Sequence, residues 1–320
     1  MKPQLVFATF LALIAPAALA ADGTFDRTLS VGAAPSLTIS AGSGYIHVSS
    51  GSGNQVHIIG HVHVKSGWIS SGGDEDRVKQ IVANPPIQQS GDTLSIGGHV
   101  DSDLFRNISI DFDITTPQRS SVKANEGSGS VQMSGIEGMV SAQSGSGDIR
   151  VENIGSGVRL NTGSGSVTAN NIGANARIET ASGSIHATGV RGAATLHTSS
   201  GGLDLSLTAP GDINVGTSSG SIRITGLSGG LHAGSSSGSI EVAGNPTADW
   251  RIGTSSGGVR LSPDPAAHFS VDADTGSGSI HVDRPIIMQG DLNRHHVNGT
   301  VNGGGPTIHI STSSGSVSIH

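Results

Sequence analysis

Residues 146–187 read SGDIRVENIGSGVRLNTGSGSVTANNIGANARIETASGSIHA, and this stretch decides the fold. A four-residue motif, Ser-Gly-[Ser/Gly/Asp]-[Ile/Val/Leu], returns in it every 18 residues and continues almost to the end of the chain. The repeated glycines of the motif are Gly129, Gly147, Gly165, Gly183, Gly201, Gly220, Gly238, Gly257, Gly278 and Gly315. A fixed period of this length is typical of proteins in which each repeat packs only against its neighbours.

A finer pattern within each period indicates strands. Apolar residues at positions i and i+2 occur twice per period, as in Val158 and Leu160, then Val167 and Ala169. Alternation with a period of two is typical of a strand with one buried face. Strands this short are not stable alone, so each must stack on its equivalent one period away. The sequence therefore predicts an all-β fold, a single-chain parallel β-solenoid of about ten 18-residue rungs with two main strands per rung.

The corners of the rungs also have a recognisable composition. We expect the repeated glycine at a corner, where a positive φ is favourable and a side chain would collide with the next rung. A threonine in phase with the inward residues stands three positions earlier at Thr162, Thr180, Thr198, Thr217, Thr254, Thr275 and Thr312. Because buried hydroxyl groups need partners, we predict a buried ladder of hydrogen bonds there. Trp250 and Phe269 are in inward phase too, beside longer turns that would widen the rung locally.

Residues 21–125 do not follow the period and are expected to form an irregular β-rich N-terminal cap with the first strands. Such a cap blocks the exposed edge of the first rung. Alternating apolar residues predict strands at Tyr45–Val48, Val56–Val64, Thr93–Ile96 and Ile108–Ile114. An acidic first turn at Asp74 and a stop at Asn84-Pro85 predict one short helix.

The solenoid is expected over residues 126–320, continuous with the cap as one structural unit, with an insertion near residues 284–307. The last predicted strand contains Val317 and Ile319, and no helix, proline or charge follows to cover its edge. We expect the insertion to fold back over this edge, which favours a monomer. End-to-end pairing with another chain is the alternative.

Composition limits the kinds of function. Aromatic residues make up only 3% of the 320 residues, too few to fill the thick core of a large α/β enzyme. The chain is 34% hydrophobic and 13% charged, which does not fit a disordered protein. The net charge of -7 argues against nucleic acid as a partner. With no cysteine, the chain has no disulfide, no lipid-modified cysteine, no catalytic cysteine and no Cys-ligated metal.

Residues 1–20, MKPQLVFATFLALIAPAALA, have the features of a secretory signal peptide. One lysine precedes an apolar stretch, and Ala18-Leu19-Ala20 fits a cleavage site before Ala21. Pro16 interrupts an apolar run that is already short for a membrane span. No later stretch is apolar enough to cross a bilayer, so no transmembrane anchor is expected. The protein is predicted to be exported, and to be periplasmic, secreted or loosely associated with the cell surface.

Two motifs resemble functional sites and are explained by the repeat. The string Gly-x-Ser-x-Gly occurs at Gly216–Gly220, Gly234–Gly238 and Gly253–Gly257, but no helix is expected after it, as a nucleophile elbow requires. A calcium-binding β-roll has a carboxylate at every turn, whereas here only Asp148 occupies that position. We therefore expect no catalytic residue, no cofactor and no repeated calcium site.

Histidines and arginines supply the candidate binding residues. His61 and His63 share the outward face of one strand, and His47 is expected nearby, so these three could bind a transition metal; a solvated polar face is the simpler interpretation. His295 and His296 are adjacent and would point in opposite directions. A candidate surface-binding column for acidic or sugar-rich polymers consists of Arg150, Arg159, Arg177, Arg223, Arg251 and Arg260.

A solvated face is the alternative for the arginines as well. One outward column runs through Asp204, Arg223, Glu241, Arg260 and His281, and charges of alternating sign avoid repulsion between rungs. Exposed ion pairs of this kind contribute at most about 1 kcal/mol each.

The order of features resembles a known family. A strand ISIDFDITTP at residues 108–117 precedes the Gly-Ser-Gly rungs, and the chain ends in HVNGTVNGGGPTIHISTSSGSVSIH from residue 296. Over residues 35–320 this is similar to the bacterial putative-adhesin β-solenoid family, a domain of unknown function. The resemblance implies a surface or periplasmic protein with an adhesion or scaffold role, and it brings no catalytic residues.

We therefore expect a non-enzymatic, exported, adhesin-like or scaffold protein whose partner is a surface polymer or protein. A periplasmic, envelope-associated protein that binds a polymer or polysaccharide is the first alternative. A polysaccharide-active β-helix enzyme is the second, and it would need acidic residues gathered on adjacent rungs.

Overall fold

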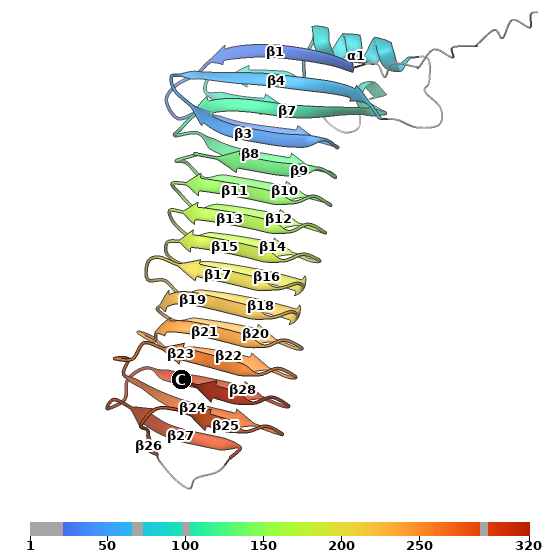
Figure 1. Ribbon diagram of the computed structural model, residues 1–320. Helices are drawn as coiled ribbons and strands as arrows, with labels where there is room; N and C mark the ends of the chain where they lie inside the picture. Colours follow the sequence, from blue (N-terminus) through green and yellow to red (C-terminus); the bar gives the residue numbers. More distant parts are fainter. Residues whose placement is uncertain (1–21, 66–72, 98–102, 289–293) are drawn as a thin grey trace, which may run out of the picture.

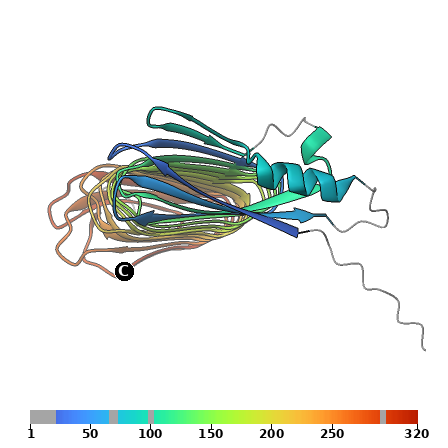
Figure 2. The same cartoon turned by 90° about the horizontal axis from the view of Figure 1, so that it is seen from above.

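The repeating strands form two long sheets that face each other along a rod (Figure 1). The computed structural model describes residues 22–65, 73–97, 103–288 and 294–320, so the predicted signal peptide lies outside the described residues. One sheet has 14 strands and the other 15, and we call them sheet A and sheet B. Viewed along the rod, the cross-section is flat and elongated (Figure 2). The predicted parallel β-solenoid is confirmed.

Sheet A consists, in spatial order, of β1 (Asp22–Ser30), β4 (Gln55–Val64), β7 (Ile108–Pro117), β3 (Tyr45–Gly51), β9 (Ser130–Ser134), β11 (Ile149–Ile154), β13 (Val167–Ile172), β15 (Ile185–Val190), β17 (Leu203–Leu207), β19 (Ile222–Ser228), β21 (Ile240–Asn245), β23 (Val259–Pro263), β29 (Val317–Ile319) and β25 (Ile280–Val282). Sheet B consists, in spatial order, of β26 (Ile287–Met288), β27 (His296–Val301), β24 (Phe269–Thr275), β28 (Thr307–Thr312), β22 (Trp250–Thr254), β20 (Leu231–Ser235), β18 (Ile213–Ser219), β16 (Ala194–Ser200), β14 (Ala176–Thr180), β12 (Val158–Thr162), β10 (Val140–Ser144), β8 (Ser121–Glu126), β2 (Ser36–Ala41), β6 (Thr93–Ile96) and β5 (Ile87–Ser90).

Each rung is one strand of sheet B followed by one strand of sheet A, as the two apolar pairs per period predicted. In the regular part, equivalent residues of successive rungs pair in register, so that Val158 pairs with Ala176 and Val167 with Ile185. The pairing is parallel, because each rung returns to its starting side before the next one begins.

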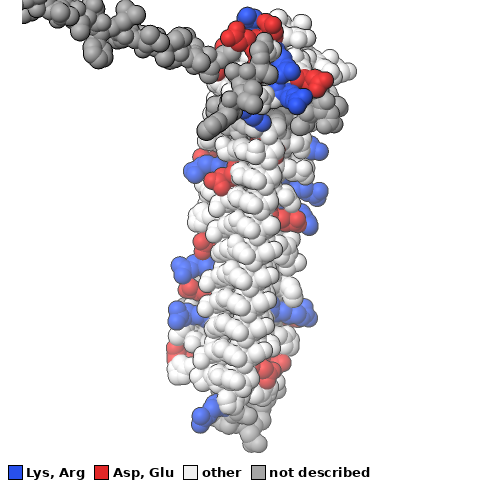
Figure 3. All heavy atoms as spheres, turned by 90° about the vertical axis from the view of Figure 1, so that its right-hand side faces the viewer, with Lys and Arg blue, Asp and Glu red and all other residues white. Residues whose placement is uncertain are grey.

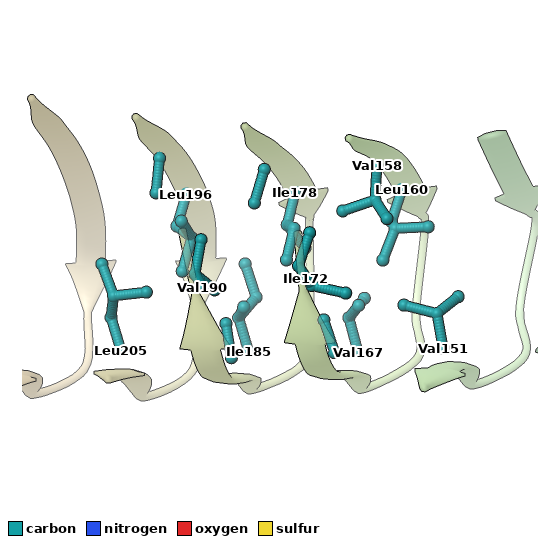
Figure 4. Packing of buried hydrophobic residues seen from close by; sticks show 14 of the residues in the cluster. Val151, Val158, Leu160, Val167, Ile172, Ile178, Ile185, Val190, Leu196 and Leu205 are labelled. Carbon is teal, nitrogen blue, oxygen red and sulfur yellow. The ribbon is translucent and has the colours of Figure 1, made fainter. Parts of the chain in front are cut away.

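The core is the narrow space between the two sheets. Inward side chains alternate with outward ones along every strand, and Val167 and Ala169 are fully buried. Figure 4 shows valine, leucine and isoleucine side chains from the two sheets meeting between the ribbons. Two sheets pack about 10 Å apart, which suits small aliphatic side chains and explains the shortage of aromatic residues. Trp250 is buried as predicted, and its indole Nε1 donates to the Gly229 carbonyl at 2.9 Å.

The predicted hydrogen-bond ladder lies at the corner that leads from sheet B to sheet A. Thr162 Oγ1 donates to the Gly147 carbonyl of the preceding rung at 2.8 Å, and Thr180 donates to Gly165 at 3.0 Å. The remaining predicted threonines make the same bond from Thr198, Thr217, Thr254, Thr275 and Thr312. Ser144 and Ser235 take the same place in two rungs. Every one of these hydroxyl groups is therefore buried with a partner.

Two reasons were expected for the repeated glycines, a positive φ and a lack of space at the corner, and the structure supports the second of them. None of them is among the described residues with positive φ, so that expectation was wrong. The expected collision is confirmed, since a Cβ atom on Gly165 would lie 2.1 Å from the carbonyl oxygen of Gly147. Stacked corners approach so closely that a side chain has no room.

The N-terminal cap closes one end of the rod. β1 pairs antiparallel with β4, and β4 pairs antiparallel with β7, which extends sheet A beyond the first rung. The predicted helix is confirmed as α1 (Asp74–Ala83), which packs on β1 and β4, and a short helix η1 (Asp103–Phe105) follows. Within the described ranges, no helix is long and apolar enough to span a membrane.

The first regular rung begins inside the segment expected to form the cap. β2 pairs in parallel with β8, and β3 pairs in parallel with β9, in the register of the later rungs. Residues 52–120 are therefore a long excursion between the first rung and the second. Its described strands β4, β5, β6 and β7, together with β1, cap this end of the rod.

The C-terminal rungs do not stack in sequence order. β28 lies between β22 and β24, and β29 lies between β23 and β25, so the last rung of the chain fills a gap left by the previous one. The expectation that Val317 and Ile319 form an open edge was wrong, because their strand is paired on both sides. The insertion forms β26 and β27, which fold back on β24 and not on the last strand. The long turn after β23 leads to β24, which lies one position beyond β28 in sheet B.

One arginine holds this rearranged end together. Arg284 Nε donates to the carbonyl of His320 at 2.6 Å, and Arg284 Nη1 donates to the carbonyl of Asp264 at 2.9 Å. Its other terminal nitrogen donates to the carbonyl of Pro263. The chain terminus and the crossing turn are thereby tied to the same side chain.

Candidate functional site

The histidines proposed as metal ligands lie on the outward face of sheet A, in the cap. His61 and His63 are on β4, and His47 is on β3, with β7 between these strands. His47 Nδ1 and His61 Nε2 both approach Asp113 of β7, at 3.1 and 3.6 Å. The structure thus brings His47 and His61 to one carboxylate.

His63 does not share Asp113 with these two histidines and contacts two other aspartates. It lies between Asp22, at 3.1 Å from Nδ1, and Asp111, at 3.3 Å from Nε2. The hydroxyl of Tyr45 donates to Asp113 at 2.7 Å, and this hydrogen bond, together with burial, raises the pKa of Tyr45 to about 12. The face is a network of His–Asp contacts in which each histidine already has an acidic partner.

The six arginines do not form one column, which corrects the sequence expectation. Arg150, Arg223 and Arg260 project outward from sheet A. Arg159, Arg177 and Arg251 project outward from sheet B, on the opposite face. Figure 3 shows charged side chains along both margins of the rod, with a strip of uncharged residues between them.

The outward column of sheet A differs from the predicted column at its C-terminal end, where one residue is inserted. Asp204, Arg223, Glu241 and Arg260 are neighbours on successive strands, as predicted. Ser318, however, stands between Arg260 and His281, because the last rung is inserted there.

Three of the arginines are paired and three are not. Arg150 contacts Glu152 at 2.6 Å, Arg177 contacts Glu179, and Arg223 contacts Glu241 at 3.0 Å. Within the described part of the chain, no ion pair engages the other three, which are Arg159, Arg251 and Arg260. An unpaired guanidinium is the better candidate for binding an anionic ligand, since no internal carboxylate competes for it.

One of these unpaired arginines, Arg251, borders a groove whose lining includes two glycines, Gly234 and Gly253. Gly216, Gly234 and Gly253 occupy the same outward position on β18, β20 and β22, which are neighbours in sheet B. A Cβ atom on Gly234 or Gly253 would meet nothing within 4 Å, so packing does not require a glycine at either position. Glycine in a strand interior weakens the strand and often marks a place where a ligand approaches closely.

Polar side chains surround these two glycines. The hollow has a volume of about 500 Å³, and we call it the glycine groove. Its lining side chains outside the glycines are His232 and Arg251 along one wall, His309 and Ser311 of β28, and Asp272 and Asp274 of β24. A groove that runs across several strands, with donors on one wall, suits an extended polar ligand.

The sequence contained a signal for this groove that we interpreted only as part of the repeat. The three Gly-x-Ser-x-Gly strings begin at Gly216, Gly234 and Gly253, and the last two of these glycines line the groove. In each case the string runs from a strand of sheet B through a corner to the next strand, so the helix of a nucleophile elbow is absent from these described segments.

Comparison with known proteins gives a family match. The model of the Toastrack DUF4097 family matches residues 69–215 and again residues 174–320. No curated protein matches the chain.

Solved structures with a similar chain course are distant in sequence. A "putative cell adhesion protein" from Clostridium sporogenes is 10% identical, with 93% of this chain and 99% of that chain covered and a TM-score of 0.22. A "putative adhesin" from Bacteroides fragilis is 13% identical, with coverages of 93% and 97% and a TM-score of 0.35. A "putative lipid binding protein" from Parabacteroides distasonis is 13% identical, with coverages of 93% and 96% and a TM-score of 0.39.

Proposed function

Since the chain belongs to the Toastrack DUF4097 family, we propose that it is a non-enzymatic exported protein of the adhesin-like or scaffold type, whose solenoid surface binds a partner. Export is the part of this proposal that depends on residues 1–20. The binding part depends on the glycine groove.

The glycine groove is the single observation that carries the proposal. Its lining residues come from four neighbouring strands of sheet B, β20, β22, β28 and β24, and Gly234 and Gly253 are the glycines among them. Glycine at Gly234 and Gly253 lowers strand stability without relieving a collision, so a role in binding explains it better than packing does.

We propose an acidic polysaccharide as the partner. Arg251 has no acidic partner among the described residues and can bind a carboxylate or sulfate of the sugar through two parallel hydrogen bonds. His232 and His309 flank Arg251 on the neighbouring strands and add donors for hydroxyl groups.

Two other roles remain for comparison. A periplasmic, envelope-associated polymer-binding protein would use the same groove and would differ only in location. A polysaccharide-active enzyme is favoured by one observation, the two carboxylates of Asp272 and Asp274 in the groove. Both project from β24 at one end, whereas a glycosidase places its two carboxylates on either side of the bond that it cleaves.

The experiment measures binding of purified residues 21–320 to polygalacturonate, with dextran as the neutral comparison. We expect Arg251→Gln to weaken binding of the acidic polymer by at least tenfold. Gly234→Leu should do the same by filling the groove, since a Cβ atom at this position meets no other atom within 4 Å. Arg159→Gln is the matched control, because Arg159 is also unpaired on sheet B but lies outside the groove.

Equal weakening by Arg159→Gln and Arg251→Gln would show a diffuse charge effect and would contradict the groove. Release of new reducing ends from the polymer would favour the enzyme instead.

A further inference from the structure

Outward side chains of three neighbouring strands in sheet B form a polar cluster at the C-terminal end of the rod. β24 lies between β28 and β27, and it presents Asp272 and Asp274 on its outward face. His309 of β28 pairs across from Asp272, and His296 of β27 pairs across from Asp274. Each carboxylate therefore has a histidine beside it, on opposite sides of the central strand.

The donor atoms of this cluster converge. One carboxylate oxygen from each aspartate and one ring nitrogen of His296 all lie within 4.8 Å of one another. His296 Nδ1 is 2.7 Å from Asp274 Oδ1, and His309 Nδ1 is 3.2 Å from Asp272 Oδ2. Among the described residues, Asp272, Asp274 and His296 are the one group of three possible metal ligands whose donor atoms lie within 4.8 Å of one another.

We propose that Asp272, Asp274 and His296 bind one divalent transition-metal ion of the zinc type. Carboxylate oxygen and imidazole nitrogen are the ligands that such ions accept together, and three protein ligands leave a position for water. His309 is the orienting partner, since its ring nitrogen fixes the Asp272 carboxylate as outer partners do in metal sites.

The chemistry of the cluster favours such an ion over calcium. Calcium takes six to eight oxygen ligands, whereas this site offers two carboxylates with two imidazoles. Two aspartates side by side on one face repel each other, and a bound cation removes this cost. Partial exposure of all four side chains leaves the donor atoms accessible to an ion from solution.

The ion would also join parts of the fold that are distant in sequence. Asp272 and Asp274 belong to the penultimate rung, and His296 belongs to the hairpin that caps it. A ligand that binds only the folded state raises stability according to its concentration and affinity. This inference goes beyond the proposed function and does not depend on it, because the metal is tested without any polymer.

The experiment is a calorimetric titration of the purified, untagged chain with ZnCl2, with the melting temperature recorded in parallel. We expect one ion per chain and a rise in melting temperature that EDTA reverses. Asp274→Asn and His296→Gln should each weaken binding by at least tenfold, and His309→Gln should have a smaller effect. All three positions are exposed, so circular dichroism should confirm an unchanged fold.

The matched control is His61→Gln, which removes a histidine beside a carboxylate at the other end of the rod and should leave zinc binding unchanged. The proposal would be overturned if the chain bound no zinc in the micromolar range. It would equally be overturned if the double variant Asp274→Asn, His296→Gln bound as well as the original chain.

Discussion

At the scale of single residues, Glu126 is the exception in the corner ladder. It pairs with Ser144 in the register of the ladder, so a carboxyl group stands where later rungs have a hydroxyl. Its side chain is buried, and its Oε2 atom has no hydrogen-bond partner among the described residues. Burial raises the pKa of Glu126 to about 7, against a smaller lowering by the backbone N–H groups of Ser128 and Gly127.

This raised pKa gives a testable dependence of stability on pH. Since the folded-state pKa lies above the unfolded value of 4.5, the protonated form favours folding. The contribution is fully present below about pH 4.5 and is lost as the pH rises through about 7. Glu126→Gln keeps the neutral shape, so at pH 8 it should be more stable than the original chain by about 1–3 kcal/mol.

Urea unfolding of both proteins between pH 4 and pH 8 measures this difference. The two curves should converge at the acidic end and separate above pH 6. A difference that stays constant across the whole range would mean that the pKa of Glu126 is the same in the folded and unfolded states.

Two kinds of glycine can be separated by a matched pair of substitutions. In Gly165→Ala, the new Cβ atom would lie 2.1 Å from a backbone oxygen, so the stacked corners must move apart. We expect a loss of at least about 3 kcal/mol in the free energy of unfolding, the range of severe overpacking. In Gly234→Ala the new atom meets nothing within 4 Å, and we expect a gain of about 0.5–1 kcal/mol. A loss for Gly234→Ala would show that the glycine has a packing role.

At the scale of strands and helices, the features that could be predicted from the sequence are those set by the residues of one short segment. The inward and outward phase of Val167 and Thr168, the helix at Asp74–Ala83 and the corner threonines follow from local patterns, and all are confirmed. The stacking order of the last rungs depends on a choice between two similar partners. β28 and β24 carry the same alternation, so either could pair with β22 by pattern alone. The turn after β23 leads to the more distant position, and this choice has no local signature in the sequence.

The candidate sites also differ in how far they could be predicted, because some depend on the local repeat and others on which strands pair. The glycines of the groove recur with the period and could be found by comparing outward positions along the sequence. Asp272, Asp274 and His296 come together because β27 returns antiparallel to β24, which a parallel repeat does not predict. The six arginines were misassigned to one column because successive strands of a rung belong to opposite faces.

The inserted last rung should depend on Arg284. This side chain binds three backbone carbonyls, at the chain terminus and in the crossing turn. Arg284→Ala should lower the free energy of unfolding by about 1–3 kcal/mol, because hydrogen bonds to a charged group are lost. Arg294→Ala is the control with the same change in charge, in the insertion. Equal effects of the two substitutions in urea unfolding would argue that only net charge matters.

At the scale of the whole molecule, the two ends of the rod are closed in different ways. The N-terminal end has extra strands in both sheets, β1, β4 and β7 in sheet A and β5 and β6 in sheet B, with α1 outside. At the C-terminal end, β26 and β27 extend sheet B, whereas sheet A ends at β25. β25 has only three residues, which limits the edge available for pairing with another chain.

The stacking order also determines how the rod should open. In a solenoid each rung is stabilised mainly by its two neighbours, so opening begins at the ends and spreads inward. The last strand in the sequence, β29, has a paired strand on each side, whereas β25 has one paired strand among the described residues. Amide hydrogen exchange in residues 307–319 should therefore be at least about tenfold slower than in residues 280–282.

Mass spectrometry of peptides after timed exchange in deuterated buffer measures this order directly. β28 should be about as protected as β22, because both are interior strands of sheet B. If the rungs were stacked in sequence order, residues 307–319 would form the outermost rung and would exchange first. Fast exchange of that segment would thus contradict the inserted rung. Slow exchange in residues 307–319, with fast exchange at β25, would show that β28 and β29 lie between the two rungs that precede them in the sequence.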